Sequence, residues 1–276
     1  MSNFFLRTIT GILFVIVIVG SAILNFWVFA AVFGVFTILG LWEFYNLISK
    51  TGIKPSKISG TLIGFAVYSI AVVSQAGLID KYLNIFYLII FTLSILFFFV
   101  ELYKSSETPF QNISLTFLGI IYIAIPFSLL ISMVNLKTEN TGFFTLPVLY
   151  FFIIWTYDTF AYIVGIKFGK NRLFESISPK KSWEGAIGGI FFSFVLAYIL
   201  SGFYEFISLY QWLGLAAIIV VFGTLGDLTE SMLKRSINCK DSGNFFPGHG
   251  GILDRFDSVL LSAPFVFIYL KIIELI

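Results

Sequence analysis

The sequence is poor in the residues on which most soluble enzymes rely. Only 12% of its 276 residues are charged, and it contains one cysteine, Cys239, and one histidine, His249. A single cysteine excludes an internal disulfide and a metal site built from several cysteines. The low share of charged residues excludes an ordinary soluble domain of this length.

Apolar residues instead make up 58% of the chain, and 35 residues are phenylalanines. Apolar runs of about 18 or more residues recur along the chain, and each is long enough to cross a bilayer as a helix. We therefore expect an all-α, polytopic integral membrane protein with about nine transmembrane helices. The expected spans are 8–25, 27–48, 58–78, 82–101, 113–135, 144–166, 184–204, 209–226 and 257–275.

Three details of these spans carry further expectations. The first run lacks a small-residue cleavage site after it, so it is interpreted as a retained span and not as a signal peptide. Pro126 and Pro264 fall inside spans and are expected to kink them, because proline donates no backbone hydrogen bond. The spacing of Gly185 and Gly189 lets another helix approach closely, either within the chain or in a dimer.

The cationic residues are distributed unevenly over the two sides of the membrane. With nine spans, the N-terminus and the loops after every second span share one side, and the other side holds only Lys81, Lys137 and Lys271. The positive-inside rule makes the lysine-rich side cytoplasmic. Its cations are Arg7, Lys50, Lys54, Lys57, Lys104, Lys167, Lys170, Arg172, Lys180, Lys181, Lys234, Arg235, Lys240 and Arg255.

Two polar segments, 158–184 and 227–257, belong to this cytoplasmic side and can form one site. The first is net positive and suits phosphate groups. The second is slightly net negative and would attract a polyphosphate once divalent cations were bound. Oxygen ligands without a histidine or cysteine cluster favour Mg²⁺ over zinc. We expect one or two divalent ions, and a monovalent ion in addition is left open.

The spacing of acidic residues in the second segment suggests where those ions bind. If 227–235 is helical, its polar side chains recur at intervals of three and four residues and share one face. A Gly/Pro-rich turn, 243–251, follows and can offer backbone N–H groups to a phosphate. The expected metal ligands are Asp227 and Asp254, then Glu230, and last Asp257.

Structural roles remain open for several of these residues. Asp227 and Asp254 could cap helices or pair with Arg235 and Arg255. His249 could contact a phosphate or make a structural hydrogen bond. Three other acidic residues are interpreted as ordinary interfacial charges: Glu43, Glu101 and Glu205.

The residues from Ser231 to Asp257 resemble the signature of the phosphatidate cytidylyltransferase family. The matching positions there are Ser231, Lys234-Arg235, Lys240-Asp241, Gly243, Phe246-Pro247, His249-Gly250-Gly251 and Asp254-Arg255-Phe256-Asp257. Further matches are Gly226-Asp227, Glu230, Asp158, Ala161-Tyr162, Gly165, Phe168-Gly169-Lys170, Ser178 to Gly185 and Gly188-Gly189. The resemblance covers the C-terminal half.

This resemblance implies transfer of CMP from CTP to phosphatidate at a bacterial cytoplasmic (inner) membrane. It implies two functional regions. Residues 1–140 would form N-terminal transmembrane helices that face lipid, act as a scaffold and make dimer contacts. Residues 141–276 would form the catalytic region, with polar loops 167–183 and 227–257. The expected catalytic residues are Asp227, Asp241, Asp254, Lys234 and Arg235. The expected substrate contacts are Asp158, Lys170, Lys180, Lys181, Lys240, His249, Gly250, Gly251 and Arg255. The expected partners are CTP, phosphatidate and a second copy of the chain, with no nucleic acid.

Two other functions compete with this interpretation. Several spans with acidic residues also suit a transporter or channel for an anionic solute, although the charges gather at one face and no inverted halves are visible. The other alternative is a membrane enzyme that acts on a different lipid phosphate, such as a polyprenyl phosphate. The motifs of P-loop enzymes and of soluble cytidylyltransferases are missing from the sequence.

Overall fold

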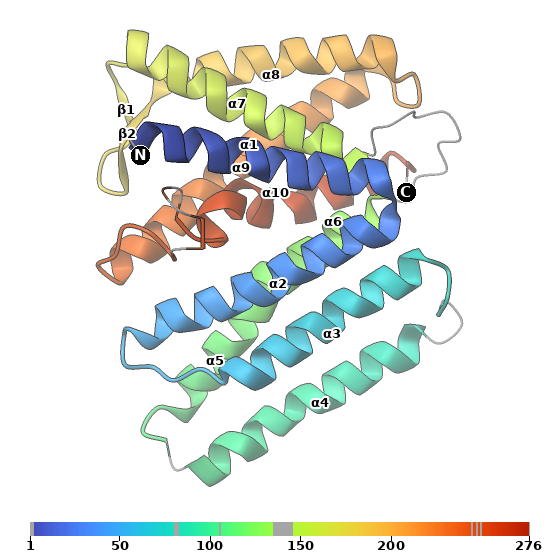
Figure 1. The fold of residues 1–276 in the computed structure, drawn as a ribbon, viewed down its shortest axis with the longest axis vertical. Coiled ribbons are helices and arrows are strands. Elements are labelled where there is room, and N and C mark those ends of the chain that lie inside the picture. Colours follow the sequence, from blue (N-terminus) through green and yellow to red (C-terminus); the bar gives the residue numbers. More distant parts are fainter. Residues whose placement is uncertain are drawn as a thin grey trace. The chain divides into compact units, whose positions relative to one another are not determined.

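A computed structural model describes residues 3–79, 83–104, 106–134, 146–243, 245, 246, 248 and 250–275. Within these residues the fold is all-α, as predicted, with one short hairpin in addition (Figure 1). The elements are α1 (Asn3–Leu24), α2 (Phe26–Ser49), α3 (Lys57–Gln75), α4 (Leu83–Lys104), α5 (Pro109–Gly119), η2 (Ile120–Ala124), α6 (Ile125–Ser132), α7 (Leu146–Phe168), β1 (Arg172–Phe174), β2 (Ser178–Ser182), α8 (Trp183–Phe203), α9 (Leu209–Ser236) and α10 (Leu253–Ile272).

Among the described residues, seven helices are long and apolar enough to cross a membrane. They are α2, α3, α4, the continuous rod of α5, η2 and α6, α7, α8 and α9. The prediction of a polytopic membrane protein is therefore confirmed. The other two predicted spans coincide with α1 and α10, which fall outside this group. The total of nine spans and their orientation stay predictions.

The chain divides into two compact units. Unit 1 comprises Met1–Ser132 and Ile237–Phe256, and unit 2 comprises Met133–Ser236 and Asp257–Ile276. The helix α10 begins in unit 1 and continues into unit 2. The functional division predicted at residue 140 stays a prediction.

The core of unit 1 is built from helices and aromatic rings. In Figure 1, α2, α3 and α4 lie side by side, and α3 also packs against η2 and α6. Phe256, in the first turn of α10, is fully buried. Its ring centroid lies 5.0 Å from that of Phe127 and 5.1 Å from that of Phe36. Such aromatic pairs add to the apolar burial, so they fix the start of α10 within unit 1.

The rod formed by α5, η2 and α6 changes its helical pitch just before Pro126. Proline has no backbone N–H to donate to the carbonyl four residues earlier. Upstream of it, the N–H of Ile125 donates to the carbonyl of Ile120, five residues back, which is the hydrogen bond of a π-helix. The irregularity predicted at Pro126 is thus a local π-helical turn.

Unit 2 is organised by close packing of α7 on α8. A Cβ atom added at Gly185 would lie 2.6 Å from the carbonyl oxygen of Ala161, and one added at Gly189 would lie 2.6 Å from the ring of Tyr157. The absence of a side chain at both glycines therefore allows α7 of the same chain to pack closely against α8. Of the two alternatives for this glycine pair, the structure favours packing within the chain.

The prediction for Glu101 was wrong. Its side chain on α4 is buried, with 3% of the residue exposed. It accepts hydrogen bonds from Asn112 Nδ2 at 3.1 Å and from Lys104 Nζ at 3.0 Å. These partners satisfy the charge, so Glu101 ties α4 to α5 and is not an ordinary interfacial residue.

We expect Gly189→Ala to lower the melting temperature of the detergent-solubilised protein, because the added methyl group has no space beside Tyr157. Overpacking of this kind costs about 1–3 kcal/mol. The matched control is Gly202→Ala in the same helix, where nothing lies within 4 Å of the added atom. Equal melting temperatures for the two variants would contradict this account of the packing.

Candidate active site

In unit 2, the polar face predicted on residues 227–235 is confirmed, because α9 continues to Ser236. Ser231 Oγ donates to Asp227 Oδ1 at 3.4 Å. Lys234 Nζ lies 2.6 Å from Glu230 Oε2, and Glu230 is 1% exposed. The predicted metal ligands Asp227 and Glu230 therefore lie on one face of α9, each beside another polar group.

The hairpin of β1 and β2 brings a lysine to this face. Lys181 on β2 forms an ion pair with Asp227, and both side chains are 28% exposed. Successive residues of a strand point to opposite sides, and the neighbouring Lys180 is exposed. The first polar segment and the start of the second thus meet within unit 2, as predicted.

The base of the hairpin is held by the first turn of α8. The carboxylate of Glu184 accepts hydrogen bonds from the backbone N–H of Lys170 at 3.0 Å and from Asn171 Nδ2 at 2.7 Å. Ser182 caps the same helix by accepting from the N–H of Gly185 at 3.1 Å. Sequence reasoning expected a polar loop at 167–183 and missed the hairpin that fixes Lys181.

Asp257 lies near other acidic residues of unit 2. Asp158, Asp227 and Glu230 each act electrostatically on Asp257, whose carboxylate accepts a hydrogen bond from the N–H of Ser258 at 2.6 Å. Like charges at short range repel one another. A bound cation would relieve this repulsion.

The described residues form no metal site enclosed by protein ligands, and the binding of Mg²⁺ stays a prediction. Over the described parts of the chain, no three His, Cys, Asp or Glu side chains are grouped closely enough to hold a metal ion. Mg²⁺ is usually bound through one or two carboxylates, together with water and substrate phosphates. The donor set in unit 2 is of that kind.

In unit 1, Asp254 is built into the loop that precedes it. Its Oδ2 accepts hydrogen bonds from Ser242 N at 3.0 Å, Ser242 Oγ at 2.8 Å and Gly251 N at 2.8 Å. Gly250 has a positive φ of 86°, and a Cβ atom there would overlap the Asp254 carboxylate. These contacts support the structural alternative for Asp254. Because a carboxylate has about four lone-pair sites, they are compatible with metal binding as well.

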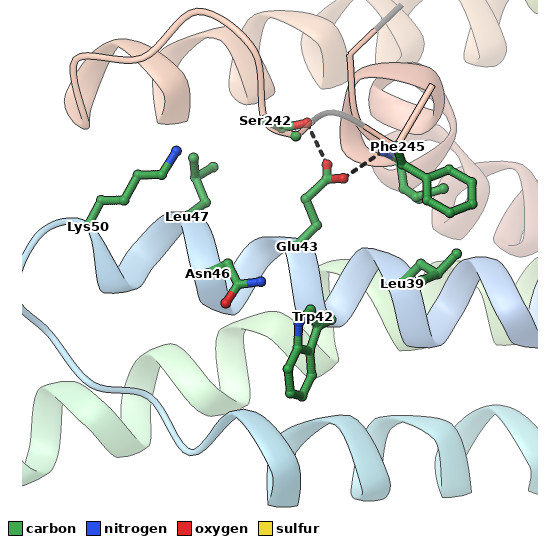
Figure 2. A pocket seen from close by; sticks show the side chains of 10 residues that line it. Leu39, Trp42, Glu43, Asn46, Leu47, Lys50, Ser242 and Phe245 are labelled. Atoms are coloured by element: carbon green, nitrogen blue, oxygen red, sulfur yellow. Dashed lines mark hydrogen bonds between the residues drawn. The ribbon is translucent and has the colours of Figure 1, made fainter. Parts of the chain in front are cut away.

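Glu43, on α2, reaches the same loop. Its Oε1 accepts from Ser242 Oγ at 2.5 Å (Figure 2) and from Leu253 N at 3.0 Å, and its Oε2 accepts from Ile252 N at 2.9 Å. The interpretation of Glu43 as an ordinary interfacial charge was wrong. The signal that could have found it is a lone carboxylate inside an apolar span, which is costly without a partner.

A cavity of about 230 Å³ lies beside Glu43, wholly within unit 1 (Figure 2). Its wall is mainly apolar, and Lys50 lies at its α2 C-terminal end. The other lining residues are Leu39, Trp42, Asn46, Leu47, Ser242, Gly243, Phe245 and Ile252.

The remaining predicted site residues are placed as follows. Asp158, Lys170, Arg235, Lys240 and Asp241 are exposed, and Arg255 and Asp257 are half-buried. His249 lies outside the described residues. Asp227 belongs to unit 2 and Asp254 to unit 1, and their binding of a common ion stays a prediction. So do the phosphate contacts expected of Gly250 and Gly251.

Comparisons with known proteins agree with the resemblance seen in the sequence. Residues 5–273 match the protein family described as "Cytidylyltransferase family". The chain belongs to this family. It is therefore a nucleotidyltransferase, and it is an integral membrane protein by its helices.

Two bacterial members of the family show the extent of the similarity. The chain is 40% identical over 184 residues to the phosphatidate cytidylyltransferase of Bacillus subtilis (strain 168). The aligned residues make up 66% of this chain and 67% of that protein. It is 34% identical over 235 residues to the phosphatidate cytidylyltransferase of Staphylococcus aureus (strain COL). Here the aligned residues make up 84% of this chain and 87% of that protein.

The ion pair of Lys181 predicts a difference between two adjacent lysines. Lys181→Ala removes the cation next to Asp227, so it should lower kcat/KM for CTP by roughly tenfold or more, about 1.4 kcal/mol. Lys180→Ala serves as the neighbouring control and should cost clearly less. If steady-state kinetics of the two folded variants were the same, the position of Lys181 beside Asp227 would have no special part in catalysis.

Proposed function

We propose that this enzyme transfers CMP from CTP to phosphatidate, giving CDP-diacylglycerol and pyrophosphate. The observation that carries the proposal is the family match over residues 5–273, together with a relative that covers 84% of the chain and is named a phosphatidate cytidylyltransferase. The transmembrane helices suit an acceptor whose acyl chains stay in the bilayer.

The reaction needs charge neutralisation more than proton transfer. A phosphate oxygen of phosphatidate attacks the α-phosphorus of CTP in line, the bond to the β-phosphate breaks, and pyrophosphate leaves. Phosphatidate is a phosphate monoester, and the second pKa of such a group is about 6. Its attacking oxygen is therefore already ionised near neutral pH. The site therefore needs no strong general base, which agrees with a chain that contains one histidine.

The chain's own cations would bind and orient the two anionic substrates. Lys181 is already beside Asp227, and Lys234 is beside Glu230. Both lysines can exchange these contacts for substrate phosphates. The other proposed phosphate contacts are Lys170, Lys180, Lys240, Arg235, His249, Gly250, Gly251 and Arg255, with Asp158 nearby in the substrate site.

The proposed Mg²⁺ ligands are Asp227, Glu230 and Asp257 in unit 2 and Asp254 in unit 1, with Asp241 as an additional acidic group. When bound, the ion neutralises phosphate charge and stabilises the leaving pyrophosphate. The position of Asp227 and Glu230 on one face of α9 supports a cation in unit 2. We also propose a cytoplasmic (inner) membrane location with the site on the cytoplasmic side, which the uneven distribution of cations supports.

The direct test is to incubate the purified protein with CTP, Mg²⁺ and phosphatidate and to measure CDP-diacylglycerol and pyrophosphate. We expect the two products in equal amounts, and none without the lipid. A polyprenyl phosphate in place of phosphatidate should give little product. Preference for the polyprenyl phosphate, or anion flux through proteoliposomes without CTP, would instead support one of the competing functions.

Removal of divalent ions with EDTA should abolish turnover, and Mg²⁺ should restore it. Asp227→Asn and Asp254→Asn should each lower kcat about a hundredfold or more, because a metal ligand supplies several kcal/mol of transition-state stabilisation. Glu205→Gln, at an exposed acidic residue, is the control and should keep full activity. A loss of only two- or threefold in Asp254→Asn would remove this residue as a ligand.

A further inference from the structure

We propose that Glu43 is a positioning residue that holds Ser242 and the first turn of α10 in the arrangement required for Asp254 to act. The inference rests on the proposed function, in which Asp254 binds the metal ion. Glu43 is remote in sequence from every residue of the family signature. It nevertheless makes three hydrogen bonds, to Ser242, Ile252 and Leu253, within unit 1.

Two of these hydrogen bonds satisfy the N-terminus of α10. The N–H groups of Ile252 and Leu253 lie at the start of this helix, where no intrahelical acceptor is available. A carboxylate there also interacts favourably with the helix dipole. Glu43 thereby fixes the first turn of α10, which carries Asp254.

The third hydrogen bond connects Glu43 to Asp254 through Ser242. The hydroxyl of Ser242 lies 2.5 Å from Glu43 Oε1 and 2.8 Å from Asp254 Oδ2. A hydroxyl has one proton to donate, so the two carboxylates share one donor. Asp254 Oδ2 also accepts from two backbone N–H groups, so the Ser242 hydroxyl is the one of its three contacts that Glu43 affects directly.

The signature glycines show how closely the loop before α10 is fitted to Glu43. A Cβ atom at Gly251 would overlap the Glu43 carboxylate, and one at Gly243 would overlap it too. Gly251 has no positive φ, in contrast to Gly250. Space for Glu43, and not backbone conformation, is thus the reason for glycine at position 251.

The first test is Glu43→Gln, compared with Glu205→Gln as the same substitution at an exposed site. The amide replaces one acceptor oxygen by an NH₂ group, which faces a donor. We expect kcat to fall about 10- to 100-fold, as for other residues that orient metal ligands. KM for CTP should change little, and half-maximal activity should need more Mg²⁺. Glu43→Asp keeps the charge, and its activity should recover in part at high Mg²⁺.

A role in stability alone predicts a different outcome. The melting temperature would then fall, while kcat, KM and the Mg²⁺ requirement of the folded protein stayed unchanged, and the proposal would be overturned. If Glu43→Gln does not fold, Glu43→Asp provides the test of kcat and of the Mg²⁺ requirement, because it shortens the side chain at position 43 and leaves Ser242 and its hydrogen bond to Asp254 in place.

The second test uses the shared space of Glu43 and Gly251. Gly251→Ala should lower activity strongly in the wild-type background but little further in a Glu43→Ala background, where the overlapping carboxylate is gone. Gly250→Ala is the control, because its positive φ and its overlap with Asp254 make it harmful in both backgrounds. Equal losses from Gly251→Ala in the two backgrounds would refute the assigned contact.

Amide hydrogen exchange separates this inference from the proposed function. Exchange at Ile252 and Leu253 should rise in Glu43→Gln and stay unchanged in Glu205→Gln, whatever reaction the enzyme catalyses. If wild-type protein made no CDP-diacylglycerol, the proposed function would fail while the exchange data still tested the contact. Unchanged exchange in Glu43→Gln would reject the contact itself.

Discussion

The structure depends on pairing each shielded carboxylate with hydrogen-bond donors or cations, in a chain in which charged residues are few. An ionised carboxylate that is shielded from water is costly unless donors or cations surround it. Glu101, Glu43, Asp254, Glu230 and Asp227 each have such partners in the structure. The positions of these partners decide where helices meet and where loops are held.

The expected metal ligands of the two units have different partners. In unit 2, lysines on a hairpin and on α9 face Asp227 and Glu230. Lysine side chains are flexible and can transfer to an incoming phosphate. In unit 1, backbone N–H groups and a serine face Glu43 and Asp254. Because backbone donors belong to the loop itself, they fix the geometry of the carboxylates.

The sequence was sufficient for the class of fold, for the family and for the polar face of α9. Long apolar runs predicted the helices, and the spacing of Asp227, Glu230 and Lys234 predicted one face of α9. The hairpin at 172–182 was missed because its polar residues show no apolar alternation. Glu43 was misjudged because its partners lie at the far end of the chain, and only the folded structure brings them within hydrogen-bonding distance.

The shared volume of Glu43 and Gly251 has a consequence for how such enzymes diverge. Neither position can change freely, because a methyl group at 251 and a full-length glutamate at 43 occupy the same place. A shorter acidic residue on α2 would have to appear before, or together with, any larger residue in the loop. The two sites should therefore covary across family members, although they lie more than two hundred positions apart in the chain.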